Sequence, residues 1–150
     1  QCGKRIEEKL GDQMDFINLK SDPRVDLTQY DCVILGGSIY IGRIQKEITK
    51  FALENLKILN NKKVGLFICC LKDGEEAKTE LETAFPDALL EHATAKDYFG
   101  GQVTFQKLNF LERLIMKKVA KTDHDICNIL NDKIDHFVHL LKSEDVTPLN

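Results

Sequence analysis

Two apolar runs without alternation, joined by an amphipathic segment, limit the possible folds of this chain more than any other feature. The runs lie in residues 32–35 (CVIL) and 62–71 (KKVGLFICCL), and such runs are typical of strands covered on both faces of a parallel sheet. Residues between them recur at three- and four-residue steps, which predicts an amphipathic helix: Ile44, Ile48, Phe51, Ala52 and Leu56. A strand, a helix and a strand with short connections predict a βαβ unit.

The remaining sequence continues this alternation. Helix formers in residues 1–10 predict a short helix that ends at Gly11, and residues 14–19 (MDFINL) predict a short strand. After a turn at Asp73-Gly74 we expect a helix stopped by Pro86, a strand that ends at Gly100-Gly101, and helices over residues 107–121 and 124–142. The pattern predicts a three-layer, doubly wound parallel α/β sheet in a single domain over residues 1–150.

The charge of the chain argues against nucleic-acid binding, and its cysteine content favours a reducing compartment. The net charge is -3 and the pI is near 5.8, whereas nucleic-acid binding needs a strongly basic face. No apolar run approaches the roughly 18 residues of a membrane span. Of the five cysteines, Cys69 and Cys70 are adjacent in a strand, so they should point to opposite faces and not bond to each other. A reducing, cytoplasmic setting fits this cysteine usage.

A glycine-rich segment follows the first apolar run and predicts a binding site. The sequence is YDCVILGGSIYIGR, from Tyr30 to Arg43, and ligands of open parallel sheets bind at the carboxyl ends of the strands. Glycines there let the backbone approach a ligand, the amides of residues 38–42 can hydrogen-bond its polar edge, and Tyr40 can lie against a flat aromatic group. The alternative is a tight turn in which Tyr40 covers a helix end.

The order of three segments resembles a known family. The segments YDCVILGGSIYIGRIQKEITKF, KKVGLFICCL and DYFGGQVTFQKLNFLERLIMKKVAK together resemble the flavodoxin-like FMN proteins, particularly the branch with the menaquinone-dependent protoporphyrinogen dehydrogenases. The resemblance covers residues 1–121. It implies a flavodoxin-like fold and non-covalently bound FMN, with two loops bracketing the flavin ring. The implied cofactor-binding residues are Gly36, Gly37, Ser38, Ile39, Tyr40, Ile41 and Gly42 in one loop, and Cys70, Leu71, Lys72 and Asp73 in the other.

One departure from the family bears on the cofactor. Flavodoxin-like domains begin with a strand and a phosphate-binding loop at the first helix N-terminus. This chain begins within what resembles that first helix, and the strand and loop are lacking. We therefore expect the domain to be N-terminally incomplete, with the phosphate-binding residues upstream of Gln1.

Residues 107–121 predict a basic amphipathic helix. Its apolar side carries Leu108, Leu111, Leu114, Ile115 and Val119, and its basic residues, against the single acid Glu112, are Lys107, Arg113, Lys117, Lys118 and Lys121. Such a helix can lie on an anionic membrane surface, which would suit a quinone partner. The alternative is a helix packed on the sheet with a solvated basic rim.

The resemblance implies a redox role in two forms. One is an oxidoreductase in which FMN accepts a hydride from a reduced tetrapyrrole and passes electrons to a quinone. The other is an electron carrier that docks on redox partner proteins, and a flavin-free interaction module is a third possibility. No catalytic side chain is assigned, and Cys2 is given no role.

The histidines do not predict a metal site. His136 and His139 are three residues apart, but no carboxylate or cysteine pattern completes a zinc site near them, and the same holds for His92 and His124. Solvated or core-edge histidines are the expectation. Asp123 to Asp125 predict a helix start, because carboxylates are favourable at its positive end.

Overall fold

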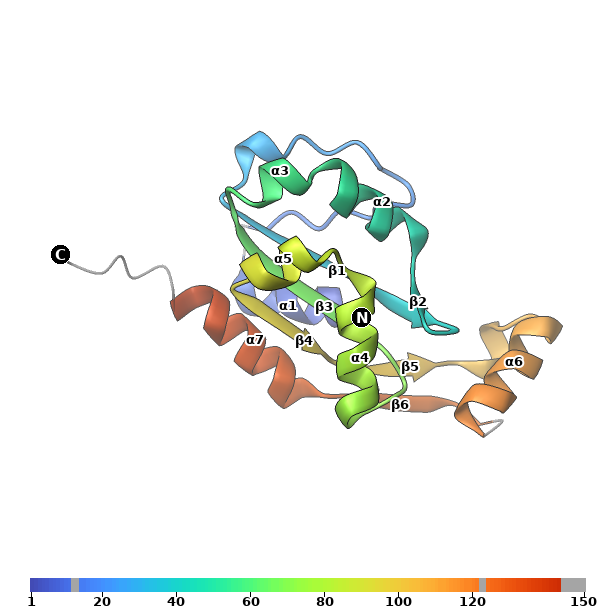
Figure 1. Cartoon of the computed structure of the whole chain (residues 1–150). Helices are drawn as coiled ribbons and strands as arrows, with labels where there is room; N and C mark the ends of the chain where they lie inside the picture. The colour runs from blue at the N-terminus through green and yellow to red at the C-terminus, as the bar shows by residue number, and fades with distance from the viewer. Residues whose placement is uncertain (12–13, 122–123, 144–150) are drawn as a thin grey trace.

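A mainly parallel sheet forms the centre of the molecule (Figure 1). The computed structural model describes residues 1–11, 14–121 and 124–143. The sheet has the order β2-β1-β3-β4, in which β1 (Cys32–Tyr40), β3 (Lys63–Cys69) and β4 (Ala95–Tyr98) are parallel and β2 (Arg43–Ile44) is antiparallel to the end of β1. β3 is buried almost throughout, as its unbroken apolar run predicts.

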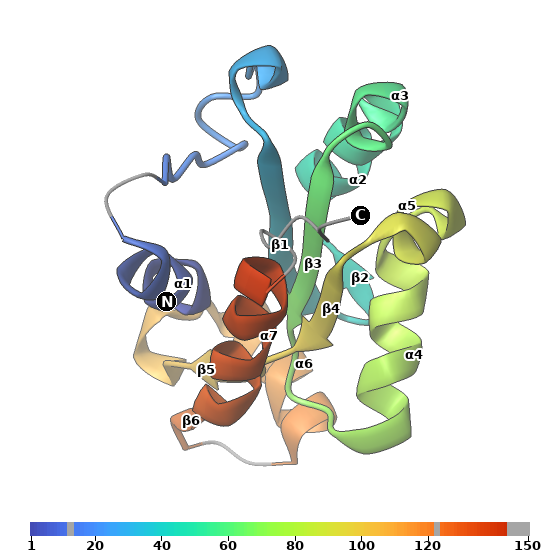
Figure 2. The same ribbon diagram turned by 90° about the vertical axis from the view of Figure 1, so that its left-hand side faces the viewer.

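Helices cover both faces of this sheet, as Figure 2 shows in edge view. One face carries α2 (Lys46–Glu54), α3 (Leu56–Leu59), α4 (Gly74–Ala84) and α5 (Asp87–His92). The other carries α1 (Cys2–Leu10) and α7 (Asn131–Ser143). The prediction of a doubly wound α/β fold is confirmed. The predicted helix after β2 is divided at Asn55 into α2 and α3.

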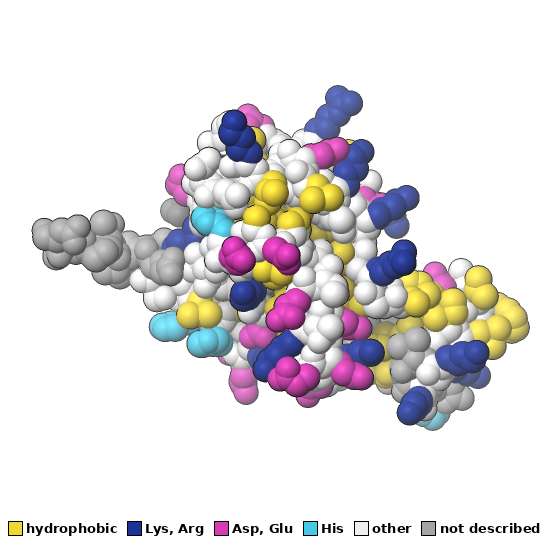
Figure 3. Space-filling view, in the orientation of Figure 1, with side chains coloured by type: hydrophobic (Ala, Val, Ile, Leu, Met, Phe, Trp, Pro, Cys, Tyr) yellow, Lys and Arg dark blue, Asp and Glu magenta, His cyan; other side chains and the backbone are white. Residues whose placement is uncertain are grey.

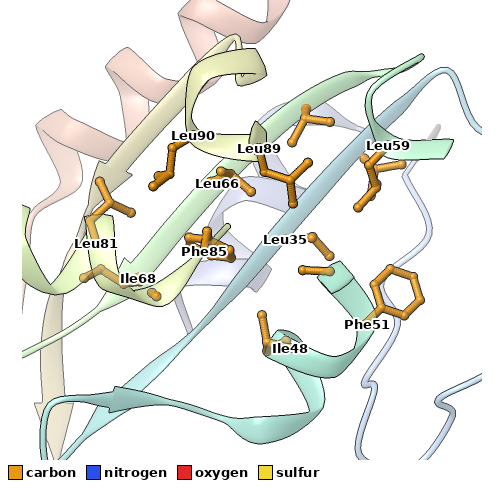
Figure 4. Packing of buried hydrophobic residues seen from close by; sticks show 14 of the residues in the cluster. Leu35, Ile48, Phe51, Leu59, Leu66, Ile68, Leu81, Phe85, Leu89 and Leu90 are labelled. Atoms are coloured by element: carbon orange, nitrogen blue, oxygen red, sulfur yellow. The ribbon is translucent and has the colours of Figure 1, made fainter. Parts of the chain in front are cut away.

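Each face of the sheet has its own hydrophobic core. The first core is mainly aliphatic, with Leu35 of β1 and Leu66 of β3 packed under the helices (Figure 4). The second is aromatic: the Phe99 ring is stacked on Phe67 at 5.1 Å and meets Phe137 edge to face at 5.2 Å between ring centroids. Cys69 packs against the second core and Cys70 lies in the first. The two adjacent cysteines therefore face opposite sides, as predicted.

A separate hairpin extends from the end of β4. It consists of β5 (Gly100–Val103) paired antiparallel with β6 (Ile126–Ile129), and the chain between them forms a 3-10 turn (Phe105–Lys107) and α6 (Phe110–Ala120). In Figure 1 α6 stands away from the central sheet. No helix in the described ranges is long and apolar enough to cross a bilayer.

The prediction of one helix over residues 124–142 is wrong in its first part. Residues 126–129 form β6, because the exposed edge of β5 offers backbone partners that a helix would leave unsatisfied. The predicted helix start is wrong as well. The Asp125 carboxylate accepts a hydrogen bond from the Phe105 amide at 2.8 Å, so it closes the hairpin. Asp123 lies outside the described residues.

The predicted strand at residues 14–19 is also not formed. This segment has no ladder partner among the described residues, and between it and β1 runs a groove of about 360 Å³. Met14, Ile17 and Leu19 line one side, and Val33 and Leu35 of β1 line the other. A strand exists only where its backbone groups find partners. Along most of β1 the edge that faces away from β3 is consequently unpaired in the described structure.

Candidate functional site

The two segments expected to hold a flavin leave neighbouring strands at the same end of the sheet. Ser38 of β1 is in register with Cys69, the last residue of β3. Adjacent strands are about 4.8 Å apart, so the segments that follow start from adjacent points. The carboxyl ends of β1 and β3 thus bring residues 36–42 and 70–73 to one edge, as the sequence predicts.

The first segment is a strand end with a tight turn and not a long loop. β1 continues through Gly36, Gly37, Ser38, Ile39 and Tyr40, and the turn consists of Ile41 and Gly42, whose φ angles are 50° and 71°. The loop boundary expected at Gly36 is therefore wrong. A β-hairpin with β2 is possible because Gly42 adopts a positive φ without strain.

The tip of this hairpin presents apolar surface to solvent. Tyr40 is 43% exposed and Ile41 is 57% exposed. Tyr40 is in register with Arg43 across the hairpin, and its exposure leaves the ring free to meet a planar partner. This exposure favours a role of Tyr40 in ligand binding over the alternative, in which Tyr40 covers a helix end.

Gly36 and Gly37 differ in what an added side chain would meet. A Cβ on Gly36 would lie 2.1 Å from two ring carbons of Phe67, so only glycine fits beside that ring. A Cβ on Gly37 would approach the side-chain atoms of Gln45, Ile44 and Ile48 at 2.9–3.2 Å. Neither glycine has a positive φ. Packing against the Phe67 ring is enough to explain a glycine at position 36. Position 37 instead lies against side chains in and just after β2 of the β1–β2 hairpin.

The second segment, residues 70–73, is held by hydrogen bonds from two directions. The Cys70 amide donates to the Gly100 carbonyl at 3.0 Å. Asp73 is the N-cap of α4, and its Oδ1 accepts from the Gly74 amide at 2.7 Å. That bond, followed by one from the Tyr98 hydroxyl, holds the pKa of Asp73 below its usual value. Leu71 is half-buried, and Lys72 and Asp73 are exposed.

Tyr98 and Lys133 position this segment, and sequence reasoning missed both. The Tyr98 hydroxyl donates to Asp73 Oδ1 at 2.9 Å and accepts from the Gly74 amide at 3.2 Å. Lys133 of α7 lies 4.0 Å from the centroid of the Tyr98 ring and pairs with Asp97 at 3.1 Å. Burial lowers the pKa of Lys133, but Asp97 and Tyr98 together raise it by more. No local sequence signal indicates that Tyr98 reaches Asp73, because the contact depends on the pairing of β4 with β3.

The second glycine pair, Gly100-Gly101, allows the β5–β6 hairpin to pack against residues 70–73. Gly100 has a φ of 75°, and a Cβ there would lie 1.8 Å from the Asn128 carbonyl oxygen. A Cβ on Gly101 would lie 3.0 Å from Leu71 Cδ2 and 3.1 Å from the Cys70 carbonyl oxygen. The pair therefore permits both the β5–β6 ladder and its close approach to residues 70–71.

α6 presents an apolar face that is not covered by the described residues. Phe110, Leu111 and Leu114 are 79%, 66% and 49% exposed. Figure 3 shows the hydrophobic side chains gathered over α6 with basic side chains beside them. The β1–β2 hairpin and α6 lie at the same end of the molecule in both ribbon views (Figures 1 and 2).

The helix itself is firmly built. Its N-cap, Asn109, forms a capping box with Glu112, with reciprocal bonds of 2.8 and 3.0 Å. Arg113 Nε donates to the Phe105 carbonyl at 3.0 Å, and Met116 is buried. The predicted apolar side is thus only partly packed: Leu108 and Ile115 are half-buried. The side chain of Val119 lies outside the described part.

The histidines occupy surface positions. His92, His124, His136 and His139 are all exposed, and the ring of His92 is hydrogen-bonded to the Lys62 carbonyl at 2.6 Å. Within the described ranges no three His, Cys, Asp or Glu side chains come together as a metal site.

A family model matches most of the chain. Residues 1–129, which include both candidate segments and the hairpin with α6, match the family model described as a flavodoxin domain. The chain belongs to the flavodoxin-domain family. This membership indicates a flavin cofactor and a redox function, and it confirms the flavodoxin-like fold predicted from the sequence. The comparisons with curated proteins and with solved structures found no match.

The residues at the sheet edge fit one end of a flavin. An exposed aromatic ring at Tyr40, the apolar Ile41 and the half-buried Leu71 provide surface for a planar ring system. Backbone amides of the hairpin turn and the ordered segment 70–73 supply polar groups beside that surface. The two segments start one strand spacing apart, so they can border the same ligand.

Proposed function

We propose that this protein binds FMN non-covalently and uses it for electron transfer. The observation that carries the proposal is the convergence of residues 36–42 and 70–73 on one sheet edge, in a chain of the flavodoxin-domain family. The flavin supplies the redox chemistry by accepting and donating electrons. The protein positions the ring between Tyr40 and Leu71 and keeps Asp73 ionised through Tyr98 and Gly74.

Absorbance titration with three ligands tests the cofactor. FMN, riboflavin and FAD share the ring and differ in the phosphate part. If the phosphate-binding residues lie upstream of Gln1, residues 1–150 should bind FMN and riboflavin with similar affinity, whereas a chain extended upstream should prefer FMN. Tyr40→Ala should weaken binding of all three ligands, because it removes the ring that covers the flavin. No spectral change with any flavin, in either chain, would contradict the proposal and favour a flavin-free interaction module.

We propose further that the protein is an oxidoreductase of the protoporphyrinogen dehydrogenase type, with a quinone as electron acceptor. Support comes from α6, whose exposed apolar residues lie at the same end of the molecule as the candidate flavin site. A reduced tetrapyrrole and a quinone are both large and apolar, so an exposed apolar face suits them better than a polar docking surface would. The electron carrier is the alternative, because an apolar patch can also contact a partner protein.

The same helix supports a peripheral membrane contact through residues 107–121. Lys117 and Lys118 lie in the last turn of α6 and are exposed. Each basic residue near an anionic leaflet contributes on the order of 1 kcal/mol. Changing both residues to Glu reverses the charge, so binding to anionic vesicles should fall more than tenfold at low salt.

The control is a matched double reversal elsewhere on the surface. Lys50 and Lys57 are exposed on α2 and α3, and changing both to Glu alters the net charge equally without touching α6. Vesicle sedimentation should separate the two variants, and protoporphyrinogen oxidation coupled to a menaquinone analogue should fall only in the α6 variant. If native protein shows neither vesicle binding nor quinone-coupled turnover, the dehydrogenase proposal fails and the electron carrier is the better account.

A further inference from the structure

A network of charged and polar groups connects the candidate flavin site to α7. The Asp73 carboxylate accepts hydrogen bonds at Oδ1 from the Gly74 amide at 2.7 Å and from the Tyr98 hydroxyl at 2.9 Å. The Tyr98 side chain is 5% exposed, and Lys133 Nζ lies 4.0 Å from the centroid of its ring. Lys133 Nζ also pairs with Asp97 Oδ1 at 3.1 Å. The start of α4, the end of β4 and α7 therefore share one connected network.

The network carries one negative charge that it does not balance. Lys133 is paired with Asp97, which leaves Asp73 as the uncompensated carboxylate. Within the described ranges, the hydrogen bonds to the Asp73 side chain are made to Oδ1, and Oδ2 accepts none. Asp73 is exposed and belongs to segment 70–73. The unbalanced charge therefore lies at the sheet edge proposed to hold the flavin.

Tyr98 and Lys133 stabilise the ionised form of Asp73. The buried Tyr98 hydroxyl fixes one carboxylate oxygen, and a cation over the ring polarises the phenol so that it donates more strongly. The pKa of Asp73 agrees with this arrangement: it is held below its usual value by the Gly74 amide first, then by Tyr98, with a smaller contribution from the charge of Lys133.

We propose that Tyr98 and Lys133 are positioning residues that set the negative charge beside a bound flavin and thereby its reduction potential. The inference rests on the proposed function. Reduction adds electrons to the flavin ring, so a fixed carboxylate beside it destabilises the reduced state relative to the oxidised state. Asp73 therefore lowers the potential, and the charge of Lys133 partly opposes that effect.

Reductive titration of the flavin-bound chain with dithionite tests the proposal. Asp73→Asn removes the charge but keeps an N-cap acceptor, so the midpoint potential should rise. Lys133→Met removes the cation, so the potential should fall. In each variant the ratio of the dissociation constants for reduced and oxidised flavin should change about tenfold, which equals about 30 mV for two electrons. General loosening of the site would not produce shifts of opposite sign.

Two further variants separate the network from net charge and from helix capping. Lys96 lies on the same strand as Tyr98 and donates to the Leu90 carbonyl at 2.9 Å, outside the network. Lys96→Met changes the net charge as much as Lys133→Met does, but should change the ratio by less than about twofold. In a Tyr98→Phe background, Asp73→Asn should raise the potential by less than it does in the native protein, because the carboxylate is no longer held in place.

A measurement without flavin distinguishes failure of this inference from failure of the proposed function. In the flavin-free protein, the pKa of Asp73, followed by NMR, should rise in Lys133→Met and stay the same in Lys96→Met. An unchanged Asp73 pKa in Lys133→Met would overturn the network, whether or not flavin binds. Flavin that binds with the same potential in Asp73→Asn and Lys133→Met as in the native protein would overturn this inference alone, whereas a native chain that binds no flavin overturns the proposed function as well.

Discussion

Gly36→Ala should destabilise the protein through a single contact with Phe67. The added Cβ would lie 2.1 Å from Cε1 and Cζ of that ring, whereas carbon atoms pack at about 3.5–4.0 Å, so the ring would have to move by roughly 1.5 Å. It has little room, because Phe99 is stacked on it at 5.1 Å and Phe137 lies edge-on at 6.1 Å between centroids.

The expected loss follows from this overpacking. Inserting a methyl group into a closely packed core costs about 1–3 kcal/mol, and for a domain of this size about 2 kcal/mol lowers the melting temperature by about 4–8 °C. Gly37→Ala is the matched control. Its Cβ would meet only the side-chain atoms of Gln45, Ile44 and Ile48, at 2.9–3.2 Å, so it should cost less than about 1 kcal/mol.

A double mutant identifies the contact responsible. Phe67→Leu removes the ring, so Gly36→Ala combined with Phe67→Leu should be at least about 1 kcal/mol more stable than the sum of the two single effects. Urea unfolding of the four proteins gives these free energies. If Gly36→Ala is as stable as the native protein, or if the two effects simply add, the packing account of Gly36 is refuted and a role in ligand approach becomes the better explanation.

Two further predictions concern the second segment and the hairpin. Tyr98→Phe removes a donor to Asp73, so the pKa of Asp73, measured by NMR, should rise toward its usual value. Because that pKa is depressed in the folded protein, the stability lost in Tyr98→Phe should be greatest near pH 7 and should shrink as pH falls below about 4; a difference that is constant with pH contradicts this. Gly100→Ala places a Cβ against the Asn128 carbonyl at positive φ, so its yield of folded protein in expression should drop sharply. Gly11→Ala shares the positive φ but meets open space, so it should lower the yield much less.

The sequence predicts the layers of this fold well because they depend on local patterns. The apolar run of β3 and the helical periodicity around Phe51 are visible in single segments. The errors arise where structure depends on a partner. Residues 126–129 become a strand only because β5 lies beside them, and residues 14–19 do not become one because no strand among the described residues pairs with them.

The candidate site shows the same division. The glycines and Tyr40 could be found because they follow a buried run at a strand end. Tyr98 could not be found, since its contact with Asp73 joins residues from adjacent elements whose pairing is known only in the folded chain. The need for a glycine at position 36 could not be predicted either, because it depends on the ring of Phe67 on a neighbouring strand. The edge of the sheet that carries the candidate site is therefore predictable from the sequence, whereas the contacts made there by Tyr98 and Phe67 are seen only in the structure.

The groove beside β1 has a consequence for how the isolated chain behaves at high concentration. Along residues 33–37 the edge of the strand that faces away from β3 lies next to apolar walls and has no ladder partner in the described structure. Such an edge is a template for β-augmentation by any extended segment whose alternate side chains are apolar. Self-association of this chain should therefore begin at β1, and a lysine placed on that edge, as natural edge strands carry, should delay precipitation without altering the helices on either face.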